Sequence, residues 1–453
     1  MSPAPVLLWF RQDLRLADNP ALAAALERRA PVIPVFVWAP EEEGHWPPGA
    51  ASRWWLERSL ASLNADLEKR GSRLIIRRGP TAAALGRLAA ESGASAVFWN
   101  RRYEPAAIAR DRDVETKLRA SGLTAGSFNA SLLFEPWTIR NGSGQPFRMF
   151  TAFWRACLRG SVAPASKNAP SRLPAPDSWP PSLALPDLSL APAVDWAGGL
   201  RQVWQPGESG AMRQLQRFLR QALAEYSANR DRPGIAGTSR LSPHLHFGEI
   251  GPGQVWRAIL RLPNGGSAAC RAYLRQMGWR EFAYHLLYHN PDSPQAALRP
   301  EFEAFPWRRN AASLRAWQGG QTGYPFVDAG MRELWSAGWM HNRARMVAAS
   351  FLVKHLLIDW RPGAAWFWDR LVDADLANNT LGWQWVAGCG ADAAPYFRIF
   401  NPAVQAARFD AAGDYVRRWV PELARDQAYP PPIVDHAEAR ERALASLESI
   451  RRR

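Results

Sequence analysis

The sequence predicts an α/β domain with a parallel, Rossmann-like sheet, followed by an all-α domain. Short apolar runs alternate with helical stretches over the first 130 or so residues, a rhythm typical of parallel strands joined by helices. From about residue 206 onward, the apolar residues recur almost wholly at helical spacing. Between the two patterns lies a stretch rich in Pro and Ser without a sustained period, which is typical of an extended linker.

The elements of the α/β domain, residues 1–130, follow in order along the chain. Its predicted strands are residues 6–10, 32–38, 74–77 and 96–99. Its predicted helices are residues 19–29, 54–69 and 81–91, with Pro20 at a first-turn position. The predicted linker covers residues 131–205 and is Pro-rich from about residue 160. The helical domain covers residues 206–453, with strong helical stretches at 212–226, 270–288 and 328–357 and a break near Gly338.

Composition restricts the partners and the setting. The net charge of +15 predicts a polyanionic partner such as nucleic acid, because a basic protein gains affinity by releasing phosphate counterions. Cys157, Cys270 and Cys389 are too few and too far apart for a disulfide framework or a four-thiolate site, so we expect no metal. There is no signal peptide and no run of about 20 apolar residues. We therefore expect a cytoplasmic protein without a membrane span.

Two helical segments present candidate binding faces. Helical spacing puts Tyr273, Gln276, Trp279 and Arg280 on one wall, which suits a pocket for a flat polar ligand or ordinary core packing. A second helix carries Asn342, Arg345 and Met346 on one face. Polar groups on an apolar helix need partners if they are buried, and a helix–helix salt bridge is the alternative there.

Two further segments offer acids and hydroxyls. The first contains Asp373, Asp375 and Asn379, which suit either ordinary ion pairs or contacts to a ring system rich in N–H groups. The second contains Thr238, Ser239 and Ser242 at the start of a predicted helix. Such a start binds phosphate through free N–H groups and hydroxyls, although simple N-capping explains it equally.

Taken together, five ordered blocks resemble the photolyase and cryptochrome family. The blocks are LLWFRQDLRLADNPAL, TSRLSPHLHFGEI, WREFAYHLLYHNP, GYPFVDAGMRELWSAGWMHNRARMVAASFLVKHLLIDW and DADLANNTLGWQWVAGCGADAAPYFRIFNP. They run in the family's order from about residue 5 to 420 and are most similar to bacterial photolyases that split cyclobutane pyrimidine dimers. The resemblance implies a monomeric, light-driven repair enzyme for UV-damaged DNA, with FAD in the helical domain.

The resemblance also implies which residues hold FAD. They are Tyr226, Thr238, Ser239, Arg240, Leu241, Ser242, Tyr273, Arg345, Asp373, Asp375 and Asn379. Asp375 is expected to face the ring edge, and Asp373 to pair with Arg345. Asn379 matches the residue beside flavin N5, where plant cryptochromes have Asp. A neutral amide tolerates an anionic reduced flavin that a carboxylate would oppose, so Asn379 favours the repair branch.

A lesion site and an electron path follow from the same resemblance. The residues at lesion and DNA-contacting positions are Arg230, Gln276, Trp279, Arg280, Asn342, Arg343, Met346 and Trp385. Photolyases are among the enzymes that flip their target out of the duplex. We therefore expect Trp279 to stack on a flipped dimer. The expected electron path to the flavin consists of Trp383, Trp360 and Trp307.

Departures from the family's patterns keep alternatives open. Gln276 stands where the cyclobutane enzymes carry Glu, and its amide cannot supply a proton. A cryptochrome-like photoreceptor without repair is therefore the main alternative. A 6-4 photolyase is another, disfavoured because those enzymes carry His at the position of Asn342. Ala106 and Ala107 replace the Asn and Glu of one folate-binding pattern, which leaves methenyltetrahydrofolate bound differently, 8-hydroxydeazaflavin or no antenna.

Overall fold

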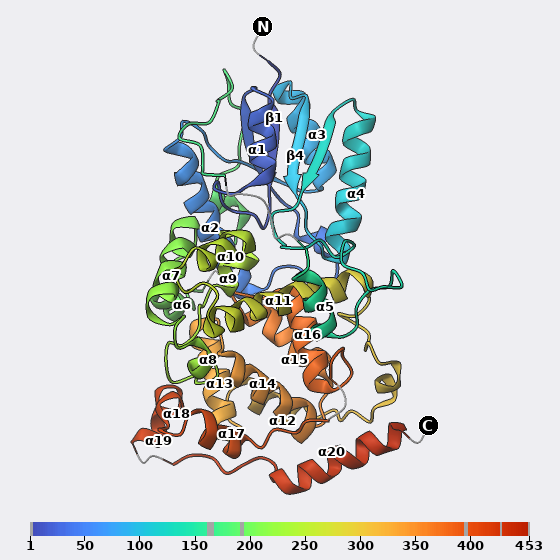
Figure 1. Cartoon of the computed structure of the whole chain (residues 1–453), viewed down its shortest axis with the longest axis vertical. Coiled ribbons are helices and arrows are strands. Elements are labelled where there is room, and N and C mark those ends of the chain that lie inside the picture. Colours follow the sequence, from blue (N-terminus) through green and yellow to red (C-terminus); the bar gives the residue numbers. More distant parts are fainter. Residues whose placement is uncertain (1–2, 161–166, 191–193, 394–396, 426–427, 452–453) are drawn as a thin grey trace.

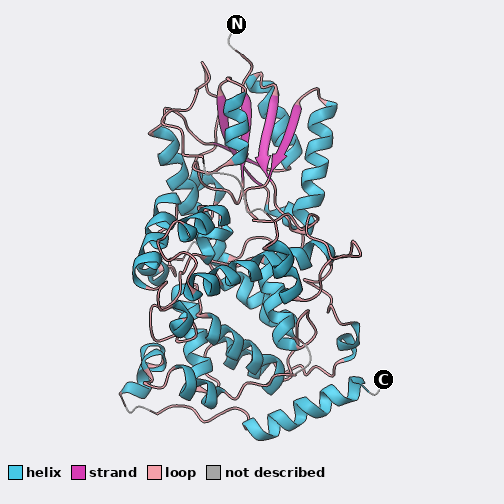
Figure 2. Ribbon diagram, in the orientation of Figure 1, coloured by secondary structure: helices cyan, strands magenta, loops and turns pink. Residues whose placement is uncertain are grey.

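The computed structural model describes residues 3–160, 167–190, 194–393, 397–425 and 428–451. It confirms the predicted combination of folds: a five-stranded parallel sheet in an N-terminal α/β domain, and a largely helical C-terminal domain. Figure 1 shows the sheet at one end of the molecule and the helical domain at the other. The arrowheads in Figure 2 show that the carboxyl ends of the strands point toward the helical domain.

The sheet has the strand order β3-β2-β1-β4-β5, and every neighbouring pair is parallel. Its strands are β1 (Val6–Phe10), β2 (Val32–Trp38), β3 (Ile75–Arg78), β4 (Ala96–Asn100) and β5 (Thr124–Phe128). Strands β1, β2 and β4 are buried along their whole length, because apolar side chains point to both covered faces. The prediction missed the edge strand β5, whose TAGSF sequence lacks an apolar run.

Helices cover both faces of the sheet, and alternate residues of β1 divide between two cores. Val6, Leu8 and Phe10 pack in one core with α1 (Pro20–Glu27) and α2 (Ala50–Glu68). Leu7 and Trp9 pack in the other with α3 (Thr81–Ser92) and with α4 (Pro105–Ala120), a helix that the sequence did not predict. This division follows from the two-residue period of a strand.

The segment after β5 is irregular and packs against both domains. It contains α5 (Phe150–Cys157), the short η2 (Leu185–Leu188) and α6 (Gly198–Val203). Leu173, Leu188 and Leu190 are buried in the core beside α1 and α2, and the backbone N–H of Leu173 donates to the carbonyl of Arg70 at 3.0 Å. The predicted linker is thus packed onto the sheet domain from Leu173 to Leu190, whereas Phe150 and Phe153 of α5 are buried with helices of the second domain. Residues 161–166 and 191–193 lie outside the described residues.

The described part of the helical domain contains helices and no strand. Its longer helices are α7 (Glu208–Gln221), α10 (Pro252–Leu260), α11 (Ala268–His289), α12 (Ala311–Gln318), α13 (Pro325–Ala337), α14 (Asn342–Ser350), α15 (Trp360–Arg370), α16 (Leu376–Ala387), α17 (Pro402–Phe409) and α20 (His436–Arg451). Its shorter turns are α8 (Tyr226–Asn229), α9 (Ser242–His246), η3 (Pro300–Ala304), the π-helical η4 (Phe351–His355), α18 (Asp414–Trp419) and α19 (Pro421–Ala424). None of the described helices is long and apolar enough to cross a membrane.

Of two predicted features of the helices, the structure confirms one and contradicts the other. The break near Gly338 is confirmed: this glycine adopts a left-handed φ of 62° and ends α13. The continuous helix predicted for 212–226 is wrong, because α7 ends at Gln221 and Tyr226 begins the separate α8. The amides of Ala222 and Leu223 both donate to the carbonyl of Phe218, which stops the regular helical ladder there.

Candidate functional site

A buried carboxylate, Asp375, lies at the start of α16 and is held from three elements. Its Oδ1 accepts hydrogen bonds from the backbone N–H and side-chain amide of Asn378, at 2.8 and 2.7 Å. Its Oδ2 accepts a hydrogen bond from the phenol of Tyr284 on α11, and His246 Nδ1 lies 3.7 Å from the same oxygen. Burial alone would raise the pKa of Asp375, but His246, Arg280 and Tyr284 favour the carboxylate and hold that pKa well below its usual value. Asp375 is therefore a fixed internal negative charge.

A second carboxylate, Asp373, forms an ion pair with Arg345 of α14. Both of its oxygens accept hydrogen bonds from Nη2 of Arg345, at 2.9 and 2.8 Å. Arg345 Nε also donates to the carbonyl of Met340 at 2.7 Å. The structure thus forms the pair that the resemblance implied, and the charge of Asp373 is neutralised within the protein.

Asn379 follows Asp375 by one helical turn. The backbone N–H of Asn379 donates to the carbonyl of Asp375 at 2.8 Å. The Nδ2 atom of Asn379 donates to the carbonyl of Ala364 on α15 at 3.1 Å, which fixes the plane of the side-chain amide. A neutral amide therefore stands one turn from the ionised carboxylate.

An aromatic wall connects α8 with α11. The buried Tyr273 donates its hydroxyl hydrogen to Ser239 Oγ at 3.0 Å, and its ring lies edge-on to that of Tyr226, with the centroids 5.2 Å apart. Gln214 Nε2 donates to the carbonyl of Ser239 at 2.7 Å. These contacts hold the 238–242 segment against the helical core.

The predicted helix start at Thr238, Ser239 and Ser242 is right only for Ser242, where the short helix α9 begins. Arg240 adopts a left-handed φ of 51°, which interrupts helical geometry before that point. Thr238 and Ser239 therefore lie in a half-buried loop, and the next residue after Arg240, Leu241, is fully buried.

Arg240 is an incompletely paired cation in this loop. Its guanidinium lies over the indoles of Trp204 and Trp339, 4.6 and 4.7 Å from their centroids. The buried Nε of Arg240 has no hydrogen-bond partner among the described residues. Trp339 Nε1 donates to Ser242 Oγ at 3.3 Å, so the indole beside Arg240 is itself fixed.

These residues fit the chemical groups of FAD. A pyrophosphate needs positive charge and hydroxyl donors, and Arg240, with its unpaired buried Nε, lies in one loop with the hydroxyls of Thr238 and Ser239. A flavin ring offers N–H groups, for which Asp375 is an ionised acceptor, and carbonyl oxygens, for which Arg345 is a donor. Among the described residues, no cluster of His, Cys, Asp or Glu suits a metal ion.

The expected lesion residues lie on α11 and α14, and both helices pack against α16. Gln276 and Trp279 are half-buried on α11. The ring of Phe150 lies parallel to the indole of Trp279, with the centroids 3.8 Å apart and the planes 9° apart. On α14, Asn342 is exposed and its Nδ2 lies 3.7 Å from the sulfur of Met346.

The three expected electron-transfer indoles share one apolar cluster. Trp360 and Trp383 are buried within it, and Trp307 packs against it from a partly buried position. The ring of Trp383 lies 4.9 Å from Phe367 and 6.1 Å from Trp317. A path from Trp383 to Trp307 within this cluster stays a prediction.

The expected DNA-contacting residues differ in environment. Arg230 and Arg343 both lie near Asp231, with N···O distances of 3.9 and 3.0 Å. Arg280 is held inside the protein, where it donates to the carbonyl of Ser131 at 2.7 Å. Trp385 lies under the guanidinium of Arg398, 5.3 Å from the ring centroid. DNA contacts by Arg230, Arg280, Arg343 and Trp385 stay predictions.

Comparisons with known proteins match both halves of the chain. Residues 6–176 match the family model described as DNA photolyase, and residues 273–428 match the FAD binding domain of DNA photolyase. A deoxyribodipyrimidine photo-lyase of Agrobacterium fabrum is 48% identical over all of this chain and 99% of its own length. The chain belongs to the photolyase and cryptochrome family.

Other members of the family are similar over most of this chain. Cryptochrome-1 of Arabidopsis thaliana is 42% identical over 92% of the chain, and the match spans 63% of the cryptochrome. The crystal structure of a class III photolyase from Agrobacterium tumefaciens superimposes with a TM-score of 0.96 at 46% identity, covering 100% of this chain and 99% of that one. Both the bacterial photolyases and the plant cryptochromes are thus relatives, with the photolyase matched along its whole length.

Sequence reasoning missed several residues that this photolyase-family site uses. Tyr284 and His246 contact the carboxylate of Asp375, and Phe150 covers a face of Trp279. A Tyr four residues after Arg280 was a usable signal, because that spacing returns to the same helix face. His246 and Phe150 gave no comparable signal, since their partners lie more than 100 positions away in the chain.

Proposed function

We propose that the protein is a deoxyribodipyrimidine photo-lyase, which splits cyclobutane pyrimidine dimers in UV-damaged DNA under blue light with FAD as its cofactor. When bound in its reduced form, FAD supplies the photoexcited electron that opens the cyclobutane ring. The full-length similarity to a bacterial photo-lyase supports this proposal. So does the net charge of +15, which suits a DNA partner.

The observation that carries the proposal is that an ionised carboxylate, Asp375, and a neutral amide, Asn379, lie one helical turn apart at the start of α16. Asp375 is kept ionised by its surroundings and is able to accept a ring N–H. Asn379 is neutral, and its amide is fixed by the carbonyl of Ala364. A site with one carboxylate and one amide at these positions tolerates a second negative charge on the ring better than a site with two carboxylates.

The other predicted site residues would bind the cofactor's phosphates, its ring system and the lesion. Arg240, Thr238 and Ser239 would hold the pyrophosphate, and Tyr273 would flank the cofactor. Trp279 would replace the stacking that a flipped dimer loses, a contribution typical of indoles in nucleic-acid sites. Gln276 would donate its amide hydrogens to the dimer's carbonyl oxygens, which Gln does as well as a protonated Glu.

For an antenna chromophore, the sequence and structure restrict the contacts but leave two candidate compounds. Ala106 and Ala107 lie in the first turns of α4 and offer no polar side chain to a ligand. Methenyltetrahydrofolate would therefore need other contacts than the Asn and Glu pattern, and 8-hydroxydeazaflavin is the alternative. We further propose that the enzyme acts as a monomer.

The proposal is tested by repair of a short duplex that contains one cyclobutane dimer. Purified, pre-reduced protein is incubated with it under blue light and, in a matched arm, in darkness. We expect recovery of intact pyrimidines only in the light. A parallel duplex with a 6-4 photoproduct tests the rival lesion, and repair of that duplex alone would overturn the proposal. Normal flavin photoreduction without any repair would instead indicate a cryptochrome-like receptor.

A further inference from the structure

We propose that Phe150 is a positioning residue for lesion recognition. Its ring fixes the indole of Trp279 and closes one of its two faces, so a flipped pyrimidine dimer has only the opposite face on which to stack. This inference rests on the proposed repair function. It adds a residue from outside the helical domain to the lesion site, since Phe150 begins α5 in the segment that follows the sheet.

The contacts of Trp279 show that one side of the indole belongs to the protein. The Phe150 ring lies 3.8 Å from it and is inclined by only 9°. Phe282 meets both rings edge-on, at 5.9 Å from each. Phe150 is 1% exposed, whereas Trp279 remains half-buried. The indole therefore has one face covered by Phe150, while part of the Trp279 side chain remains accessible to solvent.

A second indole, that of Trp154, also packs against Phe150. Trp154 lies one turn further along α5, nearly parallel to Phe150 at 6.4 Å. Its ring rests directly on the backbone of α11 at Gly278, where an added Cβ would approach the ring to 2.5 Å. Trp256 contacts the edge of Trp154 at 6.0 Å. Phe150 thus packs against both Trp154 and Trp279, and the glycine before Trp279 allows Trp154 to approach α11 this closely.

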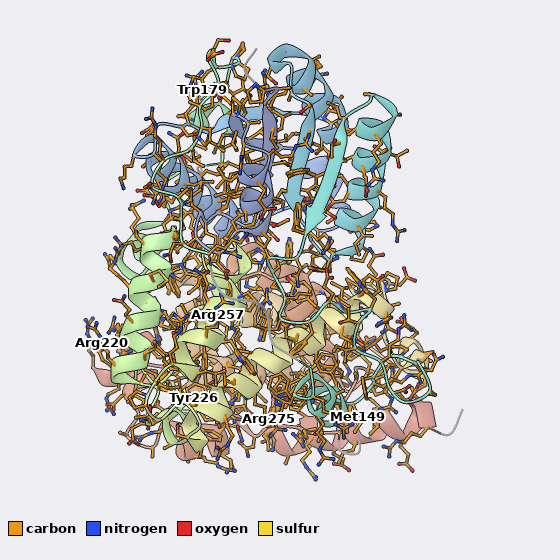
Figure 3. All side chains as sticks on the ribbon, turned by 45° about the horizontal axis from the view of Figure 1, so that its top comes forward. Met149, Trp179, Arg220, Tyr226, Arg257 and Arg275 are labelled. Carbon is orange, nitrogen blue, oxygen red and sulfur yellow. The ribbon has the colours of Figure 1, made fainter. Side chains whose placement is uncertain are left out.

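Charged groups lie close to the Phe150 ring. The exposed Arg275 places its guanidinium 5.2 Å from the centroid of Phe150. The carboxylate of Asp392 lies near the backbone N–H of Phe150, which favours its ionised form. Figure 3 labels Arg275 and Met149, the residue before Phe150, in the part of the molecule away from the sheet. A cation beside an aromatic stack suits a polyanion whose bases have been turned outward.

The consequence is a rigid platform rather than a mobile indole. A ring that is already fixed in the bound orientation loses less conformational freedom when the dimer stacks on it. A parallel aromatic pair of this kind is worth about two- to tenfold in an equilibrium constant. The contribution should appear in binding to damaged DNA, because only a flipped dimer uses the free face of Trp279.

The experiment compares Phe150→Leu with Phe153→Leu. Phe153 is equally buried on the same helix, and its ring contacts Phe282 and His285. Dissociation constants are measured at one salt concentration for a duplex with one dimer and for the intact duplex. We expect Phe150→Leu to weaken binding of the damaged duplex by about fivefold. Binding of the intact duplex, and both affinities of Phe153→Leu, should change by less than about twofold.

A double variant separates positioning from general damage to the fold. In a Trp279→Ala background, Phe150→Leu should have little further effect on the damaged duplex, because the indole it positions is gone. Equal losses in both backgrounds, or equal losses on both duplexes, would overturn the inference. If the leucine variant does not fold, Phe150→Met fills the space with a flexible chain and serves instead.

Binding measurements on the wild type distinguish a failure of the proposed repair function from a failure of the proposed role of Phe150. A wild-type protein that binds damaged and intact duplexes equally would overturn the repair function and, with it, this role of Phe150. A wild type that prefers the damaged duplex, together with an unchanged Phe150→Leu variant, would overturn the role of Phe150 alone. The flavin content of each variant, read from its absorption spectrum, should stay equal to that of the wild type.

Discussion

The phenol of Tyr284 donates a hydrogen bond to the carboxylate of Asp375 across the contact between α11 and α16. Both groups are buried. The guanidinium of Arg280 lies over the Tyr284 ring, 5.0 Å from its centroid. On the other side, His246 reaches Gln12 of the sheet domain, with 3.2 Å between their Nε2 atoms. The histidine beside the acid that would face the flavin is thus in contact with the sheet domain.

Replacing Tyr284 by Phe removes one donor from a buried carboxylate. We expect the free energy of unfolding to fall by about 1.5–3 kcal/mol, which is typical of a hydrogen bond to a charged group. FAD should also be retained less tightly, since Asp375 is less firmly oriented. Urea unfolding and flavin content after dialysis measure the two effects. The control is Tyr288→Phe, one turn further on α11, whose hydroxyl has no hydrogen-bond partner among the described residues; equal losses in both variants would contradict the assigned role.

Replacing Asp373 by Asn leaves Arg345 without its carboxylate. We expect a loss of about 1.5–3 kcal/mol in unfolding free energy, because the hydrogen bonds to a charged acceptor disappear while the carbonyl of Met340 remains. Asp414→Asn breaks the exposed pair with Arg417 and should cost at most about 1 kcal/mol. Urea unfolding of both variants decides the matter. Similar small losses would show that the Arg345–Asp373 pair does not stabilise the site.

The buried carboxyl of Glu281 should make the free energy of unfolding depend on pH. Burial raises the pKa of Glu281 to about 7, although Arg280 and the N–H groups of Phe134 and Leu133 oppose the shift. Because the folded pKa exceeds the unfolded value of 4.5, the contribution of Glu281 is full below about pH 4.5 and is lost as the pH rises through 7. The loss is on the order of 3 kcal/mol, from about 1.4 kcal/mol per pKa unit.

Glu281→Gln should remove this loss. Its amide oxygen is able to accept the same two backbone N–H groups that now donate to Glu281 Oε2. The wild type should therefore become less stable relative to the variant between pH 4.5 and 8, as urea unfolding would show. Glu115→Gln, at an exposed position on α4, should follow the wild type. Parallel wild-type and Glu281→Gln curves would be incompatible with a proton bound at Glu281.

The fold was predictable where local pattern and tertiary packing agree. Strands such as β1 and β2 were recognisable because both faces are covered and the runs are wholly apolar. The edge strand β5 was not, because its polar TAGSF sequence is a strand only by pairing with β4. The end of α7 at Gln221 was also hidden, since its amphipathic pattern continues past the turn that stops it.

The site was predictable only in part, for a related reason. The pairing of Asp373 with Arg345 follows from short segments that the family resemblance identifies. The roles of Tyr284 and Phe150 depend on contacts across 91 and 129 positions of the chain. Tyr284 shares a helix face with Arg280, which was a usable local signal, whereas nothing local distinguishes Phe150 from an ordinary core aromatic, so its contact with Trp279 is visible only in the folded structure.

Trp383→Phe tests the electron path. The indole of Trp383 is buried beside Phe367 and Trp317, and a phenyl ring preserves most of the packing while being much harder to oxidise. We expect flavin photoreduction to slow severalfold, whereas enzyme that is reduced chemically beforehand should repair dimers almost normally. Absorption spectroscopy under blue light measures the first, and dimer repair the second. An unchanged photoreduction rate would remove Trp383 from the path.

Binding of damaged DNA by Trp279→Ala tests most directly the central claim, that the helical domain takes a flipped dimer against this indole. Loss of a stacked base costs about 1–3 kcal/mol, so affinity for a duplex with one dimer should fall by about 5- to 150-fold. Affinity for the intact duplex, measured at the same salt concentration, should hardly change. Equal weakening on both duplexes, or none on either, would contradict the claim.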